Sequence, residues 1–172
     1  MLKPTSKWCW FIDPDSQMLS IDLDDMLFTT AYHQRQLLPS AAVRQEFSIE
    51  DHGFYSRLGD NLGLLPHQLT DARATQTALN ATAIKKFYRP MMPKSWYFSK
   101  HDYCGQHHGF SVLENHHGQG QVVIIDKDKI SSLCMLMSAG MQLDDKNRLS
   151  QFAAIKVMNE YLLPYLTDSS LA

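Results

Sequence analysis

The sequence RPMMPK at residues 89–94 constrains the fold more than any other stretch, because it carries two prolines. Proline has no amide hydrogen and clashes with the preceding helical turn, so Pro90 ends any helix that reaches it. It also biases Arg89 toward extended backbone angles. With Pro93 close behind, residues 89–94 are expected to form a stiff, extended turn. The chain divides here, and we predict two small domains, residues 1–90 and 91–172.

The N-terminal half begins with a predicted β-hairpin. Two aromatic or aliphatic runs, Trp8–Asp13 and Met18–Leu23, flank a Pro-Asp-Ser-Gln turn. Met26–Thr30 is a candidate third strand after two aspartates. The pattern then weakens over residues 31–65. Within that stretch, the mixed pattern of residues 49–62 fixes neither the type of element nor its boundaries.

The clearest helical pattern covers residues 66–88. Pro66 suits a first helical position, where its missing donor costs nothing, and basic residues suit the C-terminal end of the helix dipole. Apolar side chains recur on one face at spacings of three, four or seven: Leu69, Ala72, Leu79, Ala83 and Phe87. The small residues at the centre indicate close packing against a sheet or another helix.

The C-terminal half is predicted to be rich in strands. Four runs have strand character: residues 96–98, 110–113, 121–125 and 133–137. Glycines at 118–120 and the charged stretch 126–129 supply turns. A second helix is predicted over residues 150–163, with residues 167–172 as a frayed tail. The predicted fold class is α+β, with an N-terminal mixed α/β lobe and a C-terminal strand-rich lobe that carries a terminal helix.

Composition excludes several classes of protein. With 44% apolar and 20% charged residues among 172, the chain can bury a core like that of a globular protein. A formal net charge of −2 and a pI near 6.4 argue against non-specific binding of nucleic acid. No apolar run reaches the length of a signal peptide or a membrane span. Three widely spaced cysteines, Cys9, Cys104 and Cys134, fit reduced thiols in a cytoplasmic protein.

The sequence contains no catalytic motif. The glycines form neither a Gly-x-Gly-x-x-Gly sequence nor a Walker loop, and no Gly-x-Ser-x-Gly elbow occurs. Acid–base catalysis needs two carboxyl groups in a shared cleft. Pairs such as Asp22/Asp24 and Asp126/Asp128 instead flank predicted turns, where aspartate caps backbone donors. We therefore expect neither an enzyme nor a cofactor.

A group of histidines offers a competing interpretation. Four potential ligands lie close together and two more follow: His101, Cys104, His107, His108, His116 and His117. Imidazole and thiolate are zinc ligands. However, adjacent histidines on a strand point to opposite faces, and the spacing matches no compact site, so surface histidines are the simpler interpretation. The alternative hypothesis is a small zinc-binding or metal-sensing protein that uses these residues apart from His101.

The segment from residue 85 to residue 96 combines cations with apolar side chains, which suits a protein-recognition surface. Tryptophan and arginine are common interface anchors, and methionine adapts its shape to a partner. The competing interpretation is a solvated helix end with Trp96 in the core. Phe87 and Tyr97 are expected to support the surface from inside. The candidate partner-binding residues are Lys85, Lys86, Arg89, Met91, Met92, Lys94 and Trp96.

Three stretches carry a resemblance to a known family. They are MLF at residues 26–28, ALNATAIKKFYRPMMPKSWYF at residues 78–98, and AAIKVMNEYLLPYL at residues 153–166. In order and at compatible spacing over nearly the whole chain, they resemble the ZapC family of bacterial cell-division proteins. The most specific piece is MPKSW with the aromatic residues after it, and the likeness is looser over residues 31–65 and 99–121.

The resemblance implies a cytoplasmic partner of the tubulin-like GTPase FtsZ at the mid-cell division ring, with two lobes of which the second is barrel-like. Such proteins promote lateral bundling of FtsZ filaments and reduce the GTPase turnover of the polymer. FtsZ is acidic, so the cations near Lys85 gain an acidic partner. The chain is expected to be a monomer with weak self-association at most, and to bind neither nucleic acid nor membrane. The terminal Leu171-Ala172 is a candidate degradation signal.

Overall fold

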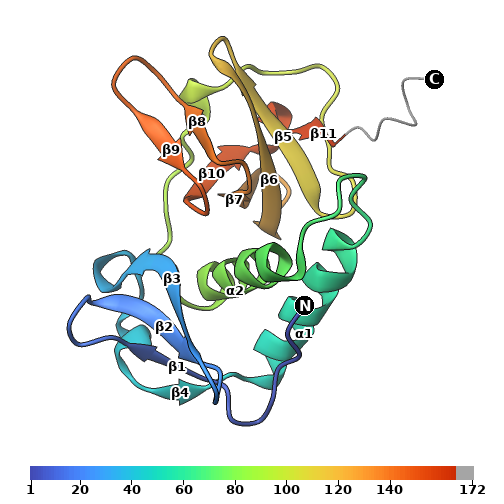
Figure 1. Cartoon of the computed structure of the whole chain (residues 1–172). Coiled ribbons are helices and arrows are strands. Elements are labelled where there is room, and N and C mark those ends of the chain that lie inside the picture. Colours follow the sequence, from blue (N-terminus) through green and yellow to red (C-terminus); the bar gives the residue numbers. More distant parts are fainter. Residues whose placement is uncertain (166–172) are drawn as a thin grey trace. The chain divides into compact units, whose positions relative to one another are not determined.

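The computed structural model describes residues 1–165, so the predicted tail and degradation signal at residues 167–172 lie outside the described residues. The chain forms two compact units, the first spanning Met1–Pro90 and the second beginning at Met91. Each unit contains an antiparallel sheet, and both α-helices found within residues 1–165 belong to the first (Figure 1). The predicted α+β class is confirmed.

The first unit contains a four-stranded antiparallel sheet in the order β3-β2-β1-β4. The predicted hairpin is confirmed as β1 and β2, and the candidate third strand is β3. Two short 3-10 helices, Gln34–Gln36 and Pro39–Ala42, connect β3 to β4. The strands are β1 (Cys9–Ile12), β2 (Met18–Asp22), β3 (Leu27–His33) and β4 (Gln45–Glu46).

Helix α1 spans Ile49–Leu62, where the sequence pattern was ambiguous. It begins with a capping box: the Ser48 hydroxyl accepts from the Asp51 N–H (3.2 Å), and the Asp51 carboxylate accepts from the Ser48 N–H (2.9 Å). Its buried positions are Asp51, Tyr55, Leu58 and Leu62, at helical spacing. The aspartate among them, together with Gly53, obscured the apolar period in the sequence.

Helix α2 spans Asp71–Phe87, so it begins five residues after the predicted start. Thr70 provides the N-cap because its hydroxyl accepts from the Arg73 N–H (3.2 Å), whereas Leu65 before Pro66 has no side-chain acceptor. The predicted single stripe is also wrong. Ala72 is exposed, and burial runs round most of the helix between Thr75 and Phe87.

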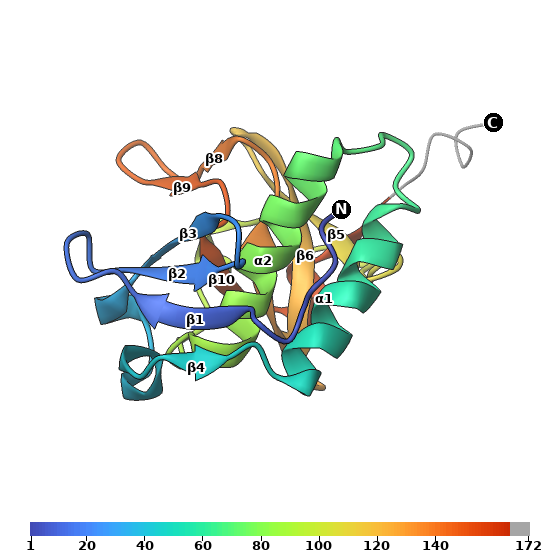
Figure 2. The same cartoon turned by 60° about the horizontal axis from the view of Figure 1, so that its bottom comes forward.

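Polar side chains buried in α2 find partners within the first unit. The Thr77 and Thr82 hydroxyls donate to the carbonyls four residues earlier, at 2.8 and 2.7 Å. The Asn80 side chain accepts from the Ala31 N–H of β3 (2.9 Å), which ties the helix to an edge of the sheet. Helices α1 and α2 lie side by side (Figure 2).

An aromatic cluster forms much of the core of the first unit. The Trp10 ring packs against Phe87 and Phe47 with centroids 5.4 and 5.5 Å apart, and Trp8 packs against Phe47 and Tyr55 at 5.4 and 5.7 Å. These rings come from β1 and the residue before it, from α1 and the residue pair before it, and from the end of α2. The cluster therefore joins the sheet to both helices.

The second unit contains a five-stranded antiparallel sheet in the order β10-β7-β6-β5-β11 and a separate hairpin of β8 and β9 (Figure 1). Among the described strands, pairing leaves β10 and β11 as edges, so barrel closure is not observed. The strands are β5 (Phe110–Asn115), β6 (Gly118–Lys127), β7 (Ser131–Leu136), β8 (Gly140–Gln142), β9 (Arg148–Ser150), β10 (Ala154–Met158) and β11 (Leu163–Pro164).

The predicted terminal helix over residues 150–163 is wrong. The chain forms β10, a 3-10 helix at Asn159–Tyr161 and β11 there. Phe152 has a φ of +68°, which a continuous right-handed helix does not allow. The β-branched residues Ile155 and Val157 instead pair with β7 and are buried, because their side chains suit a pleated sheet.

The predicted turn at residues 118–120 also lies elsewhere. His116 and His117 form the turn between β5 and β6, and Gly118 already belongs to β6. Gly120 is buried, and a Cβ added to it would lie 2.8 Å from Met141 Sδ and 2.9 Å from Leu136 Cδ1. This glycine therefore permits close packing within the sheet unit rather than a turn.

Candidate functional site

Residues 91–98, here termed the strap, are bonded to the edge strand β10. The N–H of Lys94 donates to the carbonyl of Lys156 (2.8 Å), and the N–H of Met158 donates to Ser95 Oγ (2.9 Å). The predicted strand at residues 96–98 is wrong, because Ser95–Tyr97 form a 3-10 helix. Pro93 cannot donate to a β-ladder, which disfavours a regular strand in this segment.

The strap holds large apolar side chains in solvent. Trp96 is 70% exposed and Met92 is 78% exposed, so the interpretation of Trp96 as a core residue is wrong. Phe98 is buried in the core cluster of the second unit, and Tyr97 is partly buried against that cluster. The Tyr97 ring also lies 5.5 Å from that of Trp96. The burial of Phe98 at one end of the strap and the two hydrogen bonds to β10 therefore hold the exposed Trp96 in position.

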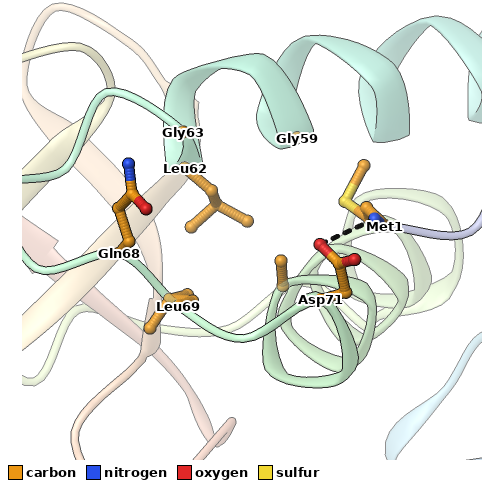
Figure 3. Close-up of a pocket in the computed structure, with 8 residues that line it drawn as sticks. Met1, Gly59, Leu62, Gly63, Gln68, Leu69 and Asp71 are labelled. Atoms are coloured by element: carbon orange, nitrogen blue, oxygen red, sulfur yellow. Dashed lines mark ion pairs between the residues drawn. The ribbon is translucent and has the colours of Figure 1, made fainter.

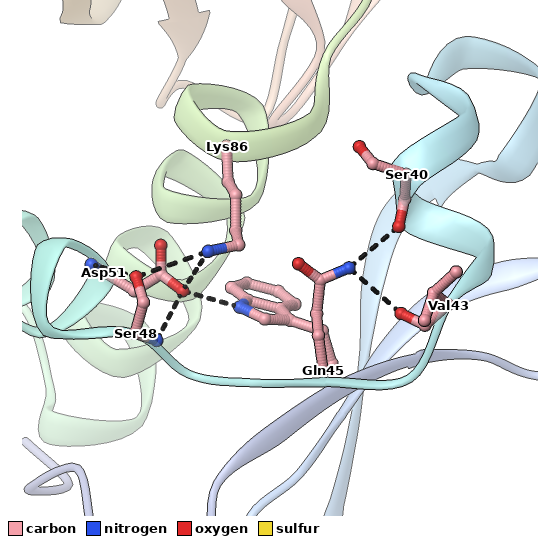
Figure 4. Close-up of polar contacts among 7 residues, drawn as sticks. Ser40, Val43, Gln45, Ser48, Asp51 and Lys86 are labelled. Carbon is pink, nitrogen blue, oxygen red and sulfur yellow. Dashed lines mark hydrogen bonds and ion pairs between the residues drawn. The ribbon is translucent and has the colours of Figure 1, made fainter.

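Lys86 is engaged inside the first unit. Its ammonium lies 3.0 Å from Asp51 Oδ2 and 3.3 Å from Ser48 Oγ, with side-chain exposures of 21% for Lys86 and 6% for Asp51. The same carboxylate oxygen accepts from the Trp10 indole N–H at 3.0 Å. Figure 4 shows Lys86, Asp51 and Ser48 with the contacts among them. We term this group the Asp51 node. It connects β1 and the ends of both helices.

The other predicted residues have different environments. Lys85, in the last turn of α2, is exposed, as are Arg89 and Lys94, while Met91 is half-buried. Arg89 Nε donates to the carbonyl of Leu37 (2.6 Å), which holds part of its guanidinium against the first unit. The predicted set is thus shared between the two units. Lys85, Lys86 and Arg89 belong to the first, and the rest belong to the second.

A groove of about 520 Å³, here termed the helix groove, lies between the N-terminal part of α1 and the C-terminal part of α2. Two predicted residues, Lys85 and Lys86, line it from α2. Ile49, Phe54 and Arg57 line it from α1, and Ile49 is 86% exposed. The groove therefore combines cationic and apolar side chains from two helices.

The sequence interpretation missed the α1 side of this groove. The sequence pattern of residues 49–62 does not fix a helix, so it does not predict that Ile49 and Arg57 line the same groove as Lys85. The Ser-x-x-Asp sequence at residues 48–51 was the available signal, because it is typical of a helix start.

A second pocket of about 230 Å³ lies between the C-terminal end of α1 and the start of α2 (Figure 3). The amino group of Met1 pairs with Asp71 at 3.0 Å on one side of it. The Met1 side chain packs so close to Gly59 that a Cβ there would collide with it. None of the predicted partner-binding residues lines this pocket.

The histidine group does not assemble into a metal site in the described residues. Cys104 and the two histidine pairs are exposed, and the rings within each pair lie close together, with centroids 4.3 Å apart for His107/His108 and 3.9 Å apart for His116/His117. Over residues 1–165, no group of three histidine, cysteine or acidic side chains could hold a metal ion. The structure therefore gives no support to the metal-binding alternative.

Two family models match the chain. The model described as "Cell-division protein ZapC, N-terminal" matches residues 1–89, and the one described as "Cell-division protein ZapC, C-terminal" matches residues 90–168. The chain belongs to the ZapC family of cell-division proteins. The matched ranges meet at residues 89 and 90, beside the boundary between the two compact units.

Full-length relatives agree with this assignment. The Cell division protein ZapC of Aeromonas hydrophila is 34% identical over 170 residues, which cover 95% of this chain and 92% of the relative. The proteins of the same name from Tolumonas auensis and Shewanella woodyi are each 35% identical, covering 96% and 100% of this chain and 93% and 96% of theirs. In the part of the chain that the structure describes, no helix is both long and apolar enough to cross a bilayer.

Proposed function

We propose that this ZapC-family chain binds FtsZ directly in the cytoplasm, at the mid-cell division ring. It promotes lateral bundling of FtsZ filaments there and reduces the GTPase turnover of the polymer. The observation that carries the proposal is family membership over both units, since the family resemblance names FtsZ as the partner. The strap supplies a surface of the right chemistry.

The strap supports the proposal because it presents apolar anchors beside a cation on a fixed backbone. Trp96 and Met92 are exposed and Lys94 is exposed between them in sequence. An anchor that is already held in place loses little conformational entropy on binding. Tryptophan is also enriched among the residues that dominate interface energetics. Lys94 adds attraction toward an acidic polymer, which raises the association rate.

Filament bundling has a physical basis in charge and in multiple contacts. Acidic filaments repel one another at short range, and bound cations offset part of that repulsion. A chain with two contact surfaces can join two filaments, and weak contacts then sum along their length. Lys85 and Arg89 of the first unit remain proposed contacts of this kind. Lys86 is a weaker candidate because its charge is already paired with Asp51.

The test is co-sedimentation of the purified chain with FtsZ polymerised by GTP, with and without the C-terminal tail of FtsZ. We expect the chain in the pellet together with more FtsZ, and a lower rate of phosphate release. Loss of pelleting without the tail would place the contact there. If the chain stays in the supernatant at tens of micromolar, where weak contacts should still register, the proposed function is overturned.

Substitutions in the strap sharpen the test. Trp96→Ala should weaken FtsZ binding by roughly thirtyfold or more, because truncating a central anchor costs about 2 kcal/mol or more. Met92→Ser should weaken it less, and Met26→Ser provides a matched control, because Met26 is also more than half exposed but belongs to the first unit. A double variant of Trp96 and Met92 that pellets like the unmodified chain would remove the strap from the proposal.

A further inference from the structure

We propose that Met92 is a reversible oxidation site, through which hydrogen peroxide lowers the affinity of the strap for FtsZ. Peroxide converts the Met92 thioether to a sulfoxide, and the sulfoxide weakens the apolar contact that the strap makes with its partner. The inference rests on the proposed function and adds a means of regulation to the same surface.

Solvent exposure distinguishes two of the nine methionines in the chain. Met92 is 78% exposed and Met26 is 54% exposed, whereas the others are half-buried or buried. An oxidant in solution reaches an exposed thioether directly, but it reaches a core methionine only when the fold opens locally. Met92 and Met26 are therefore the methionines that peroxide modifies first in the folded chain.

Met92 also lies on the surface that we propose for partner binding. It precedes Pro93, which biases its backbone toward extended angles. The N–H of Lys94 is bonded to the carbonyl of Lys156 on β10 at 2.8 Å, so the backbone beyond Met92 is held in place. The thioether therefore reaches solvent from a constrained segment close to Trp96, and a change in its polarity acts on the contact with the partner.

The oxidation step needs only peroxide. A lone pair of the Met92 sulfur attacks one peroxide oxygen, the O–O bond breaks as the S–O bond forms, and the departing hydroxide takes up the remaining proton to give water. The sulfur loses two electrons and the peroxide gains them. Methionine sulfoxide reductases reverse the step with two electrons from thiols and release the oxygen as water.

The sulfoxide acts on binding and not on the fold. Because the Met92 side chain is exposed, its oxygen stays hydrated in the free chain, and the Tm should not change. Binding removes that water and places a polar oxygen in an apolar contact. A polar group buried without a hydrogen-bond partner weakens an interface by about one order of magnitude. Leucine would supply a similar apolar volume without a sulfur, which provides a direct comparison.

The experiment treats the full chain with hydrogen peroxide and removes the excess with catalase before untreated FtsZ is added. Dithiothreitol then reverses disulfides and sulfenic acids at the thiols, including the exposed Cys104, but leaves the sulfoxide. Tandem mass spectrometry locates the added oxygen on Met92 or Met91. Pelleting with GTP-polymerised FtsZ at a series of concentrations gives the dissociation constant, and thermal unfolding checks the fold.

Two matched variants, Met92→Leu and Met26→Leu, each remove one exposed thioether. We expect peroxide to raise the dissociation constant of the unmodified chain and of Met26→Leu about tenfold. Treatment with both classes of methionine sulfoxide reductase should restore it, because each class reduces one sulfoxide epimer. The dissociation constant of Met92→Leu, whatever its starting value, should change less than about twofold on treatment.

Three results would overturn the inference and leave the proposed function intact. They are an equal loss of affinity by Met92→Leu on treatment, unchanged affinity of the unmodified chain when Met92 is fully oxidised, and a fall in Tm that accompanies the loss of pelleting. If the untreated chain itself does not pellet, the proposed function fails, and the inference on Met92 fails with it.

Discussion

Replacing Asp51 with alanine should destabilise the first unit more than any exposed substitution. The carboxylate is buried and accepts from three donors: the Trp10 indole, the Ser48 N–H and the Lys86 ammonium. Trp10 is fully buried and the Lys86 side chain is mostly buried. Water therefore cannot replace the lost carboxylate as the acceptor for both the indole N–H and the ammonium. The helix start also loses its capping box.

The magnitude follows from those contacts. Each buried donor left without a partner costs about 1–3 kcal/mol, and loss of an N-terminal cap costs about 1 kcal/mol. These terms share one carboxylate and are not additive, so we expect Asp51→Ala to lower the free energy of unfolding by about 4 kcal/mol. At about 2–4 °C per kcal/mol for a chain of this size, Tm should fall by about 8–16 °C.

The assay is urea unfolding followed by tryptophan fluorescence, together with thermal unfolding by circular dichroism. Glu50→Ala is the matched control, because Glu50 is exposed in the same helical turn and contributes about 0.3–1 kcal/mol through the helix dipole. If Asp51→Ala unfolds within 1 kcal/mol of Glu50→Ala, the assignment of the Asp51 node as a structural centre is refuted. A changed urea m-value would instead indicate altered compactness.

Three further predictions follow from other parts of the structure. Burial raises the pKa of Tyr32 well above its ordinary value of 10.0, because the ionised side chain is disfavoured inside the protein. The neutral Tyr32 side chain therefore contributes its full stabilisation below pH 10.0, and this contribution is lost as pH rises further. Tyr32→Phe should flatten the loss of stability in alkaline titrations. A thiol reagent should modify the exposed Cys104 at once and Cys134 only on unfolding, since Cys134 is buried and burial raises the pKa of its thiol. Ser95→Ala should cost about 1 kcal/mol and weaken FtsZ pelleting, because it removes one of the two hydrogen bonds between the strap and β10, whereas Ser99→Ala should leave pelleting unchanged.

Local sequence signals predicted the parts of the fold that depend on neighbouring residues. The turn between β1 and β2 needs only a short polar sequence that contains proline, and it lies where predicted. Helix α2 ends at Phe87, just before Arg89 and Pro90, because proline cannot continue a helix. The strands β5, β6 and β7 follow runs of β-branched and aliphatic residues.

The errors occur where distant residues decide the outcome. The stretch that contains Ile155 and Val157 satisfies both a helical and a strand pattern, and pairing with β7 selects the strand. Helix α1 was missed because a buried aspartate occupies one of its inward positions. That aspartate is tolerable only because Trp10 and Lys86, remote in sequence, supply donors to it.

The candidate site divides in the same way. The sequence alone indicated the cations and apolar residues between Lys85 and Trp96. It also determined that a turn with two prolines lies within this stretch, since the composition and the turn both follow from residue type and order. Only the tertiary structure decided which side chains are available. It pairs Lys86 with Asp51, leaves Trp96 exposed to solvent, and brings Arg57 of α1 and Lys85 of α2 to the lining of one groove. Exposure and charge pairing depend on contacts between distant segments, and no local pattern encodes them.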